Sequence, residues 1–175
     1  VVPPVTPEPS ANEALEELAW LAAAPARSRW TAVGTAPVDP LPHQARLIHR
    51  VVETYPRGYL FADEVGLGKT IEAGLSLREL LLSGTAQTAL LLVPASVMKQ
   101  WQEELHEKVG LDVPRYVGSS GGTHLFRDRN DQDVDVAGVN PWSAFPVILG
   151  SSHLARRKDR RRQIIEAGPW DVVLV

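Results

Sequence analysis

The chain has 175 residues, which is enough for one domain with a hydrophobic core of its own. Its formal net charge of −3 excludes a protein that is basic throughout, so any contact with nucleic acid must come from a local patch. The chain lacks cysteine, which excludes disulfides, thiolate metal sites and cysteine nucleophiles and favours a reducing, cytoplasmic location. No apolar run approaches the ~20 residues that a membrane helix requires, so we expect no membrane partner.

Residues 1–38 are predicted to be a linker with one helix. The first nine residues are rich in proline and carry no basic segment, which is typical of an extended linker and not of a signal peptide. Ser10 and Glu13 have the spacing of a capping box, so a helix is expected over residues 11–24. Because the chain starts on valine and ends within an apolar run, we interpret both ends as cuts through a longer protein.

Residues 39–175 are predicted to form one α/β unit. Apolar runs that suit strands buried on both faces alternate here with helical patterns, which favours a mostly parallel sheet with right-handed crossovers. Residues 118–146 hold glycines, serines, prolines and alternating charges, and an irregular surface excursion is expected there. The predicted helices are 42–53, 70–82, 97–109 and 153–167, and the predicted strands are 59–62, 88–93, 115–117, 147–149 and 171–175.

A glycine-rich loop between a predicted strand and a predicted helix is the sharpest motif in the chain. Glycines let the backbone turn tightly so that its N–H groups can point at a phosphate, and the helix start adds a positive dipole end. Lys69 is placed to reach the β- and γ-phosphates of ATP, and the Thr70 hydroxyl is placed to bind Mg²⁺. The alternative is an ordinary glycine turn before a helix. The predicted nucleotide-binding residues of this segment are Asp63, Glu64, Val65, Gly66, Leu67, Gly68, Lys69 and Thr70.

With these residues the chain resembles the Swi/Snf-type branch of the superfamily 2 helicase-like ATPases. Asp63 stands where the general phosphate-loop pattern has glycine, but aspartate is usual there in this family. The resemblance implies a partial RecA-like lobe, ATP and Mg²⁺ as cofactors, a catalytic role for Lys69, and ATP-driven movement on double-stranded DNA. It is carried by Asp-Pro-Leu-Pro-His-Gln at 39–44, by residues 62–74, by Leu-Leu-Val-Pro-Ala-Ser at 91–96 and by Trp-Asp-Val-Val-Leu-Val at 170–175.

The same resemblance assigns roles outside the loop. It implies that Gln44 reads the adenine edge, for which an amide offers both a donor and an acceptor. Taken alone, the segment around Gln44 would indicate only a helix that starts with proline. The resemblance also implies that Pro94, Ser96 and Ser151 contact the DNA backbone, whereas the alternative for each serine is a helix cap.

Residues 156–162 are a dense basic run that the net charge conceals. We predict that Arg156 and Arg157 bind DNA phosphates, and the alternative is a solvated helix face or a surface against acidic parts of a longer protein. The resemblance is closest to bacterial members that recycle RNA polymerase or serve in phage defence. It therefore implies a DNA-bound partner complex, such as RNA polymerase or defence-system subunits.

The strand predicted at 171–175 resembles the one that leads into the acidic motif of the family. There the next residues would be Asp-Glu-x-His, in which the aspartate holds Mg²⁺ and the glutamate positions the attacking water. We therefore expect these 175 residues to bind ATP weakly and to hydrolyse it negligibly. Two alternatives stay open, namely an RNA-directed or unwinding enzyme with the same motor core and a non-hydrolysing nucleotide-binding or interaction module that naturally ends here.

Overall fold

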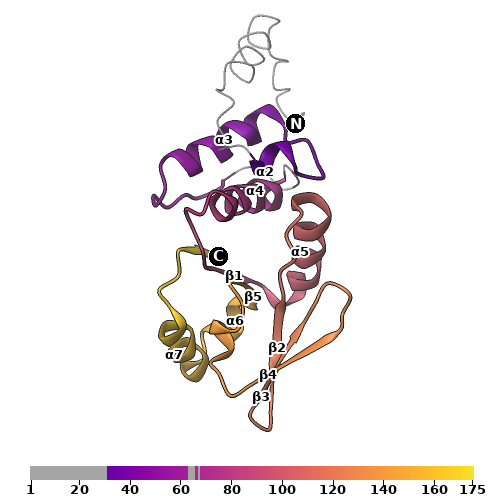
Figure 1. Ribbon diagram of the computed structural model, residues 1–175, viewed down its shortest axis with the longest axis vertical. Coiled ribbons are helices and arrows are strands. Elements are labelled where there is room, and N and C mark those ends of the chain that lie inside the picture. The colour runs from indigo at the N-terminus through magenta and orange to yellow at the C-terminus, as the bar shows by residue number, and fades with distance from the viewer. Residues whose placement is uncertain (1–30, 63–65, 67) are drawn as a thin grey trace, which may run out of the picture.

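A six-stranded sheet runs through the computed structural model, which describes residues 31–62, 66 and 68–175. The strand order is β4-β3-β2-β5-β1-β6 (Figure 1). The strands are β1 (Ala89–Val93), β2 (Arg115–Ser120), β3 (Thr123–Arg127), β4 (Asp133–Ala137), β5 (Val147–Ser151) and β6 (Val172–Leu174). The helices are α2 (Thr31–Gly34), α3 (Pro42–Glu53), α4 (Lys69–Leu82), α5 (Met98–Glu104), α6 (Ser152–Ala155) and α7 (Lys158–Ala167), with short helical turns η2 (Ala95–Val97), η3 (Leu105–Val109) and η4 (Pro141–Ser143).

Strands β5, β1 and β6 form the parallel part of the sheet. β1 pairs with β5 along its whole length, so that Val93 lies opposite Ser151, and with β6 on its other side. All residues of β1 except Leu92 are buried, which explains why its sequence is a continuous apolar run. The predicted mixed α/β fold with a mostly parallel sheet is confirmed. Because β1 and β5 are parallel neighbours, their carboxyl ends lie at the same edge of the sheet.

Helices cover both faces of this parallel part. Leu91 of β1 belongs to a core cluster with Ile48 of α3 and Leu75 of α4, whereas its neighbour Leu90 belongs to a second cluster with Ile164 of α7. Successive side chains of a strand point to opposite faces, so the two clusters lie on opposite sides of the sheet. In the part of the chain that the structure describes, no helix has the length and apolar character needed to cross a membrane.

Residues 118–146 do not form the irregular excursion that their composition predicts. The end of β2, then β3 and β4, form antiparallel pairs that extend the sheet (Figure 1). In β4 the exposed Asp133 and Asp135 alternate with the half-buried Val134 and Val136. The alternating charges are thus the outer face of a strand with period two that pairs with the preceding strand β3. The prediction was wrong because the alternation of charged and apolar residues in 133–137 is a strand pattern and not a sign of irregular structure.

Three other elements differ from the predictions. Residues 59–62 form no strand, because β6 lies across a cavity from this segment and does not pair with it. The helix predicted over 97–109 is an α-helix that continues as one π-helical segment, η3. The basic helix predicted over 153–167 is two helices, α6 and α7, because Arg157 is in an extended conformation. The helix predicted over 11–24 lies outside the described residues.

Candidate nucleotide-binding site

The phosphate loop meets α4 in the conformation that its glycines allow. Gly66 has φ 95° and Gly68 has φ 86°, both in the left-handed region that a Cβ disfavours. Gly68 is the N-cap of α4, and its carbonyl accepts hydrogen bonds from the N–H groups of Ile71 (2.8 Å) and Glu72 (3.1 Å). The backbone therefore passes into the helix through a tight turn. Asp63, Glu64, Val65 and Leu67, which were predicted to bind nucleotide, lie outside the described residues.

Lys69 and Thr70 form the first turn of α4. Both are half-buried, so each presents part of its surface at the start of the helix, where backbone N–H groups have no partner within the helix itself. A helix start carries positive partial charge, which favours an anion. The described residues include no group of three or more His, Cys, Asp or Glu side chains arranged to hold a metal ion.

Gln44 lies directly against the phosphate loop. Its Oε1 accepts a hydrogen bond from the N–H of Leu41 (2.9 Å), which is the N-cap residue of α3. A Cβ atom placed on Gly68 would lie 2.5 Å from Gln44 Nε2. Because only 3% of Gln44 is exposed, its amide is enclosed between the start of α3 and the start of α4. The structure thus brings the predicted adenine-reading residue to the loop, and the amide also caps a helix.

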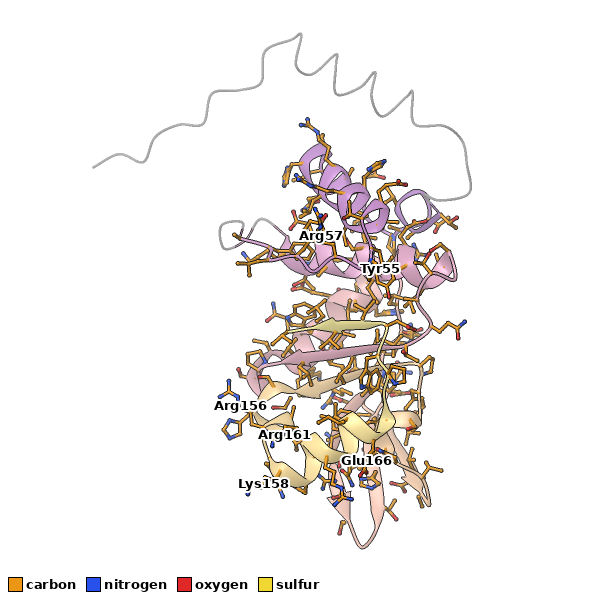
Figure 2. The ribbon with its side chains drawn as sticks, turned by 90° about the vertical axis from the view of Figure 1, so that its left-hand side faces the viewer. Tyr55, Arg57, Arg156, Lys158, Arg161 and Glu166 are labelled. Carbon is orange, nitrogen blue, oxygen red and sulfur yellow. The ribbon has the colours of Figure 1, made fainter. Side chains whose placement is uncertain are left out.

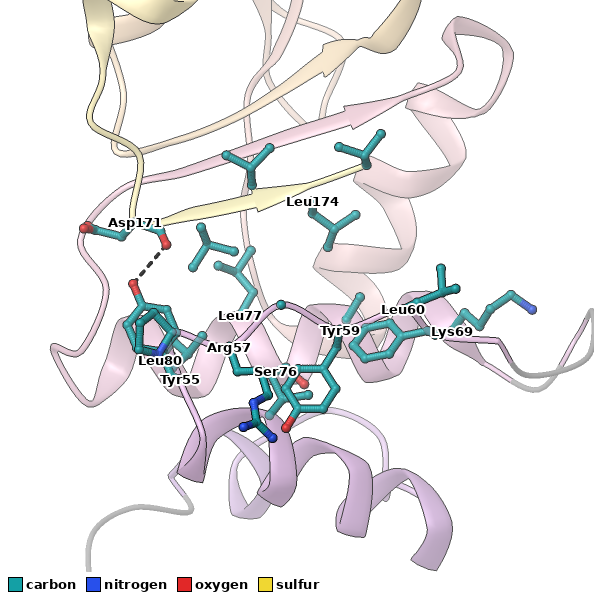
Figure 3. A pocket seen from close by; sticks show the side chains of 18 of the residues that line it. Tyr55, Arg57, Tyr59, Leu60, Lys69, Ser76, Leu77, Leu80, Asp171 and Leu174 are labelled. Carbon is teal, nitrogen blue, oxygen red and sulfur yellow. Dashed lines mark hydrogen bonds between the residues drawn. The ribbon is translucent and has the colours of Figure 1, made fainter.

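Two cavities adjoin this region. One, of about 220 Å³, is lined by His43 and Leu47 of α3, by Glu72 of α4 and by residues 60–62. The other, of about 440 Å³, lies between β6, α4 and residues 55–61. Its lining is mainly apolar, and Tyr55 adjoins it while donating its hydroxyl to the carbonyl of Asp171 at 2.9 Å (Figure 3). The ammonium of Lys69 points away from this second cavity, which is therefore not a phosphate pocket (Figure 3).

Two buried glutamates of α4, Glu72 and Glu79, are not among the residues that were predicted to form the site. Glu72 is fully buried, and its Oε1 lies 4.0 Å from Nε2 of His43 in α3. Glu79 is also fully buried, and its Oε2 accepts a hydrogen bond from the N–H of Ala32 at 2.8 Å. Burial raises the pKa of Glu79, and the backbone N–H groups of residues 31–33 oppose that shift. The signal in the sequence was that α4 is apolar on most sides, so a carboxylate within it must find partners.

The predicted DNA-contacting residues after β1 and β5 gather at one edge of the sheet. Pro94 and Ser96 are exposed beyond the end of β1. Ser151 pairs with Val93 but is only 8% exposed, so little of its hydroxyl side chain is accessible to a ligand. The half-buried Ser152 follows at the start of α6. Neither Ser96 nor Ser151 makes a side-chain cap of a helix among the described hydrogen bonds, so the alternative interpretation of these two serines as helix caps is not supported.

The fold and the site define a P-loop nucleotide-binding protein, because a left-handed glycine, a lysine and a threonine stand at the start of α4, a helix that packs on a mostly parallel α/β sheet. The chain belongs to the SNF2-related domain family, which matches residues 16–171. It is similar to the uncharacterized ATP-dependent helicase YqhH of Bacillus subtilis (strain 168), with 35% identity over 136 residues. That match covers 78% of this chain and 21% of the relative, so the chain spans about a fifth of the relative's length. The predicted Swi/Snf-type, helicase-like character is confirmed.

Proposed function

We propose that this chain is the ATP-binding part of a DNA-dependent ATPase that moves along double-stranded DNA. The observation that carries the proposal is the start of α4, where Gly68 in a left-handed conformation precedes Lys69 and Thr70 in a member of the SNF2-related family. The similarity to an ATP-dependent helicase supports ATP as the nucleotide. Movement on a duplex, rather than unwinding of it, is inferred from the Swi/Snf-type motifs.

The residues present fit a Mg²⁺–triphosphate. Apart from its chain neighbours, none of the described residues has an atom within 4 Å of the position that a Cβ on Gly66 would occupy, so these residues leave open space beside the loop. We assign the Lys69 ammonium to the β- and γ-phosphates and the Thr70 hydroxyl to the Mg²⁺ ion. Held by the Thr70 hydroxyl and the phosphates, Mg²⁺ would supply positive charge beside the transferred phosphoryl group. The role of the protein residues is to orient the phosphates against the start of α4 and to hold them there.

We place the adenine near the cavity of about 220 Å³ beside α3. His43, Leu47 and Phe61 are among the residues that line this cavity. Gln44 follows His43 in α3 and adjoins the loop at Gly68. For Gln44 to read the adenine edge, its amide must share or exchange the hydrogen bond that it accepts from Leu41. Binding of the base and capping of α3 are therefore linked in this proposal.

The DNA side of the proposal lies at the carboxyl ends of β1 and β5. Pro94 and Ser96 extend from β1, and Arg156 and Arg157 follow α6, which begins directly after β5. All four residues are exposed, and the N–H groups, hydroxyl and guanidinium groups among them suit phosphate oxygens. The low exposure of Ser151 makes it the weakest of the predicted backbone contacts.

The test is ATP hydrolysis by the complete protein that contains these residues, measured with and without duplex DNA. We expect hydrolysis that double-stranded DNA stimulates severalfold and that Lys69→Ala abolishes. Stimulation by RNA alone would favour an RNA-directed enzyme, and nucleotide binding without any hydrolysis would favour a non-hydrolysing module. Either result overturns the proposed activity while leaving the nucleotide site intact. A translocation assay that measures displacement of a duplex-bound roadblock then separates movement from unwinding.

A further inference from the structure

The basic run at 156–162 separates into two groups in the structure. Arg160 is an internal residue, since its side chain is only 12% exposed. Its guanidinium carbon lies 5.8 Å from the ring centroid of Tyr116 in β2, and its Nη2 donates to Ser119 Oγ at 2.6 Å. It also donates to Gln163 Oε1 at 2.9 Å. Arg160 therefore fastens α7 to the β2–β3 hairpin and is not available to a ligand.

Two further arginines already have carboxylate partners. Arg162 Nε lies 2.7 Å from Glu166 Oε1 across one turn of α7. Arg157 Nη2 lies 3.4 Å from Asp159 Oδ2. Each of these pairs reduces the positive field of its arginine, and binding a phosphate would compete with the carboxylate. These two arginines are accordingly weaker candidates for phosphate binding than their position in the sequence indicates.

The other three basic residues form what we call the cationic face: Arg156, Lys158 and Arg161. All three are exposed, and no carboxylate in the described ranges lies within 4 Å of them. Lys158 and Arg161 are three residues apart on α7, so they project from the same side of the helix. Arg156 precedes them between α6 and α7, and Figure 2 shows the three on the same side of the molecule.

The cationic face continues from the edge of the sheet at which β1 and β5 end. α6 begins at Ser152, directly after β5, and it contacts β1 as well. Lys69 and Val175 line one cavity, so the start of α4 lies near the carboxyl end of β6, which is parallel to β1. The proposed nucleotide site, the exposed segment at Pro94 and the cationic face are thus reached from one edge of the sheet.

We propose that Arg156, Lys158 and Arg161 bind phosphates along the backbone of duplex DNA, as a site separate from the sheet-edge contacts at Pro94 and Ser96. Exposed cations on one side of two successive helices match a polyanion whose charges recur along a line. Contacts of this kind position a protein on DNA without reading its sequence. This inference rests on the proposed function, because it takes duplex DNA as the ligand.

The test measures the affinity of the complete protein for a duplex of fixed length over a series of salt concentrations. Three phosphate contacts predict that R156Q/K158Q/R161Q lowers the steepness of the log Kd against log salt plot by about 2 to 3, at roughly 0.9 per contact. We expect weaker duplex binding at low salt and little difference at high salt. Nucleotide affinity without DNA and the Tm stay unchanged. If the triple variant folds poorly, Lys158→Gln and Arg161→Gln are measured singly, each with an expected change of about 0.9.

Arg162→Gln is the matched control, because it removes one positive charge from the same helix but from a residue paired with Glu166. Its salt dependence should stay close to that of the unmodified protein. If Arg162→Gln changed the slope of the log Kd against log salt plot as much as one of the other single variants, the effect would come from net charge alone. That result would overturn the inference. An unchanged slope in the triple variant would overturn the inference as well. If the unmodified protein binds no duplex at any salt concentration, the proposed function itself fails.

Discussion

The side-chain amide of Gln44 and the backbone of Gly68 occupy adjoining space, such that a Cβ on Gly68 would lie 2.5 Å from Gln44 Nε2. The other end of the same amide accepts the N–H of Leu41 at 2.9 Å. One side chain therefore connects the start of α3 with the last residue before α4. We therefore expect a change in the backbone at Gly68 to disturb the N-terminal cap of α3.

Gly68→Ala should weaken nucleotide binding. A left-handed conformation costs a non-glycine residue about 1–2 kcal/mol, and the new methyl group would also displace the amide of Gln44. We expect the affinity for a fluorescent ATP analogue to fall by about tenfold. Gly118→Ala is the matched control, since Gly118 has no positive φ and no atom lies within 4 Å of the place that its new methyl group would take. Equal affinities of the two variants would show that the loop does not contact the nucleotide.

Lys69→Ala should abolish ATP hydrolysis while leaving the fold intact. Lys69 is half-buried in the first turn of α4, so its replacement removes the charge that we propose to bind phosphate and removes little packing. We expect hydrolysis by the complete protein to fall by at least about 100-fold, in keeping with the loss of a preorganised charge from a phosphoryl-transfer site. Lys108→Ala, which removes a lysine paired with Glu104 at 3.6 Å, should keep full activity. If the Lys69→Ala variant hydrolysed ATP at a nearly normal rate, Lys69 would not be part of the catalytic site.

Glu79→Gln should change how stability depends on pH. Burial raises the pKa of Glu79 above its ordinary value of 4.5, so the folded state binds this proton more tightly than the unfolded state does. Its contribution to the free energy of unfolding is therefore fully present below pH 4.5 and is lost as the pH rises through the raised pKa. The glutamine variant lacks this contribution. Chemical denaturation of both proteins at several pH values isolates it, because all other titrating groups are shared. If the stability of the unmodified protein rose with pH relative to that of the variant, the result would contradict this prediction.

Phe126→Ala should strongly destabilise the fold. Phe126 of β3 is fully buried, and its ring lies 5.2 Å from that of Tyr116 and 5.0 Å from that of Phe145. Deleting a buried phenylalanine side chain costs about 3–5 kcal/mol, whereas a surface excursion would tolerate the change. Denaturant unfolding of the complete protein measures the cost. Val139→Ala is the control, because Val139 lies in the same part of the chain but is 56% exposed. Similarly small losses of stability in both variants would indicate that residues 118–146 are a loosely packed surface segment.

Helices and strands whose pattern lies within one continuous segment could be predicted from the sequence. The helix predicted over 42–53 has the same bounds as α3, and the helix predicted over 70–82 matches α4 apart from Lys69. Strand β1 was readable as well, because an unbroken apolar run of this length between turn residues suits a strand buried on both faces. The tight turn at Gly66 and Gly68 is equally local, because it depends on neighbouring residues, whereas phosphate binding by Lys69 and Thr70 stays a prediction.

Features that depend on contacts between residues far apart in the sequence could be identified only from the tertiary structure. The six basic residues of 156–162 look alike in the sequence, yet Arg160 packs on Tyr116 while Arg161 is exposed. Helix rotation and the position of the β2–β3 hairpin decide that difference. Glu79 is likewise tolerated because it meets the N–H of Ala32, 47 residues away. The sequence by itself determined the local chemistry of the nucleotide site, whereas burial and pairing across the sheet decided which charged residues serve the fold and which face a ligand.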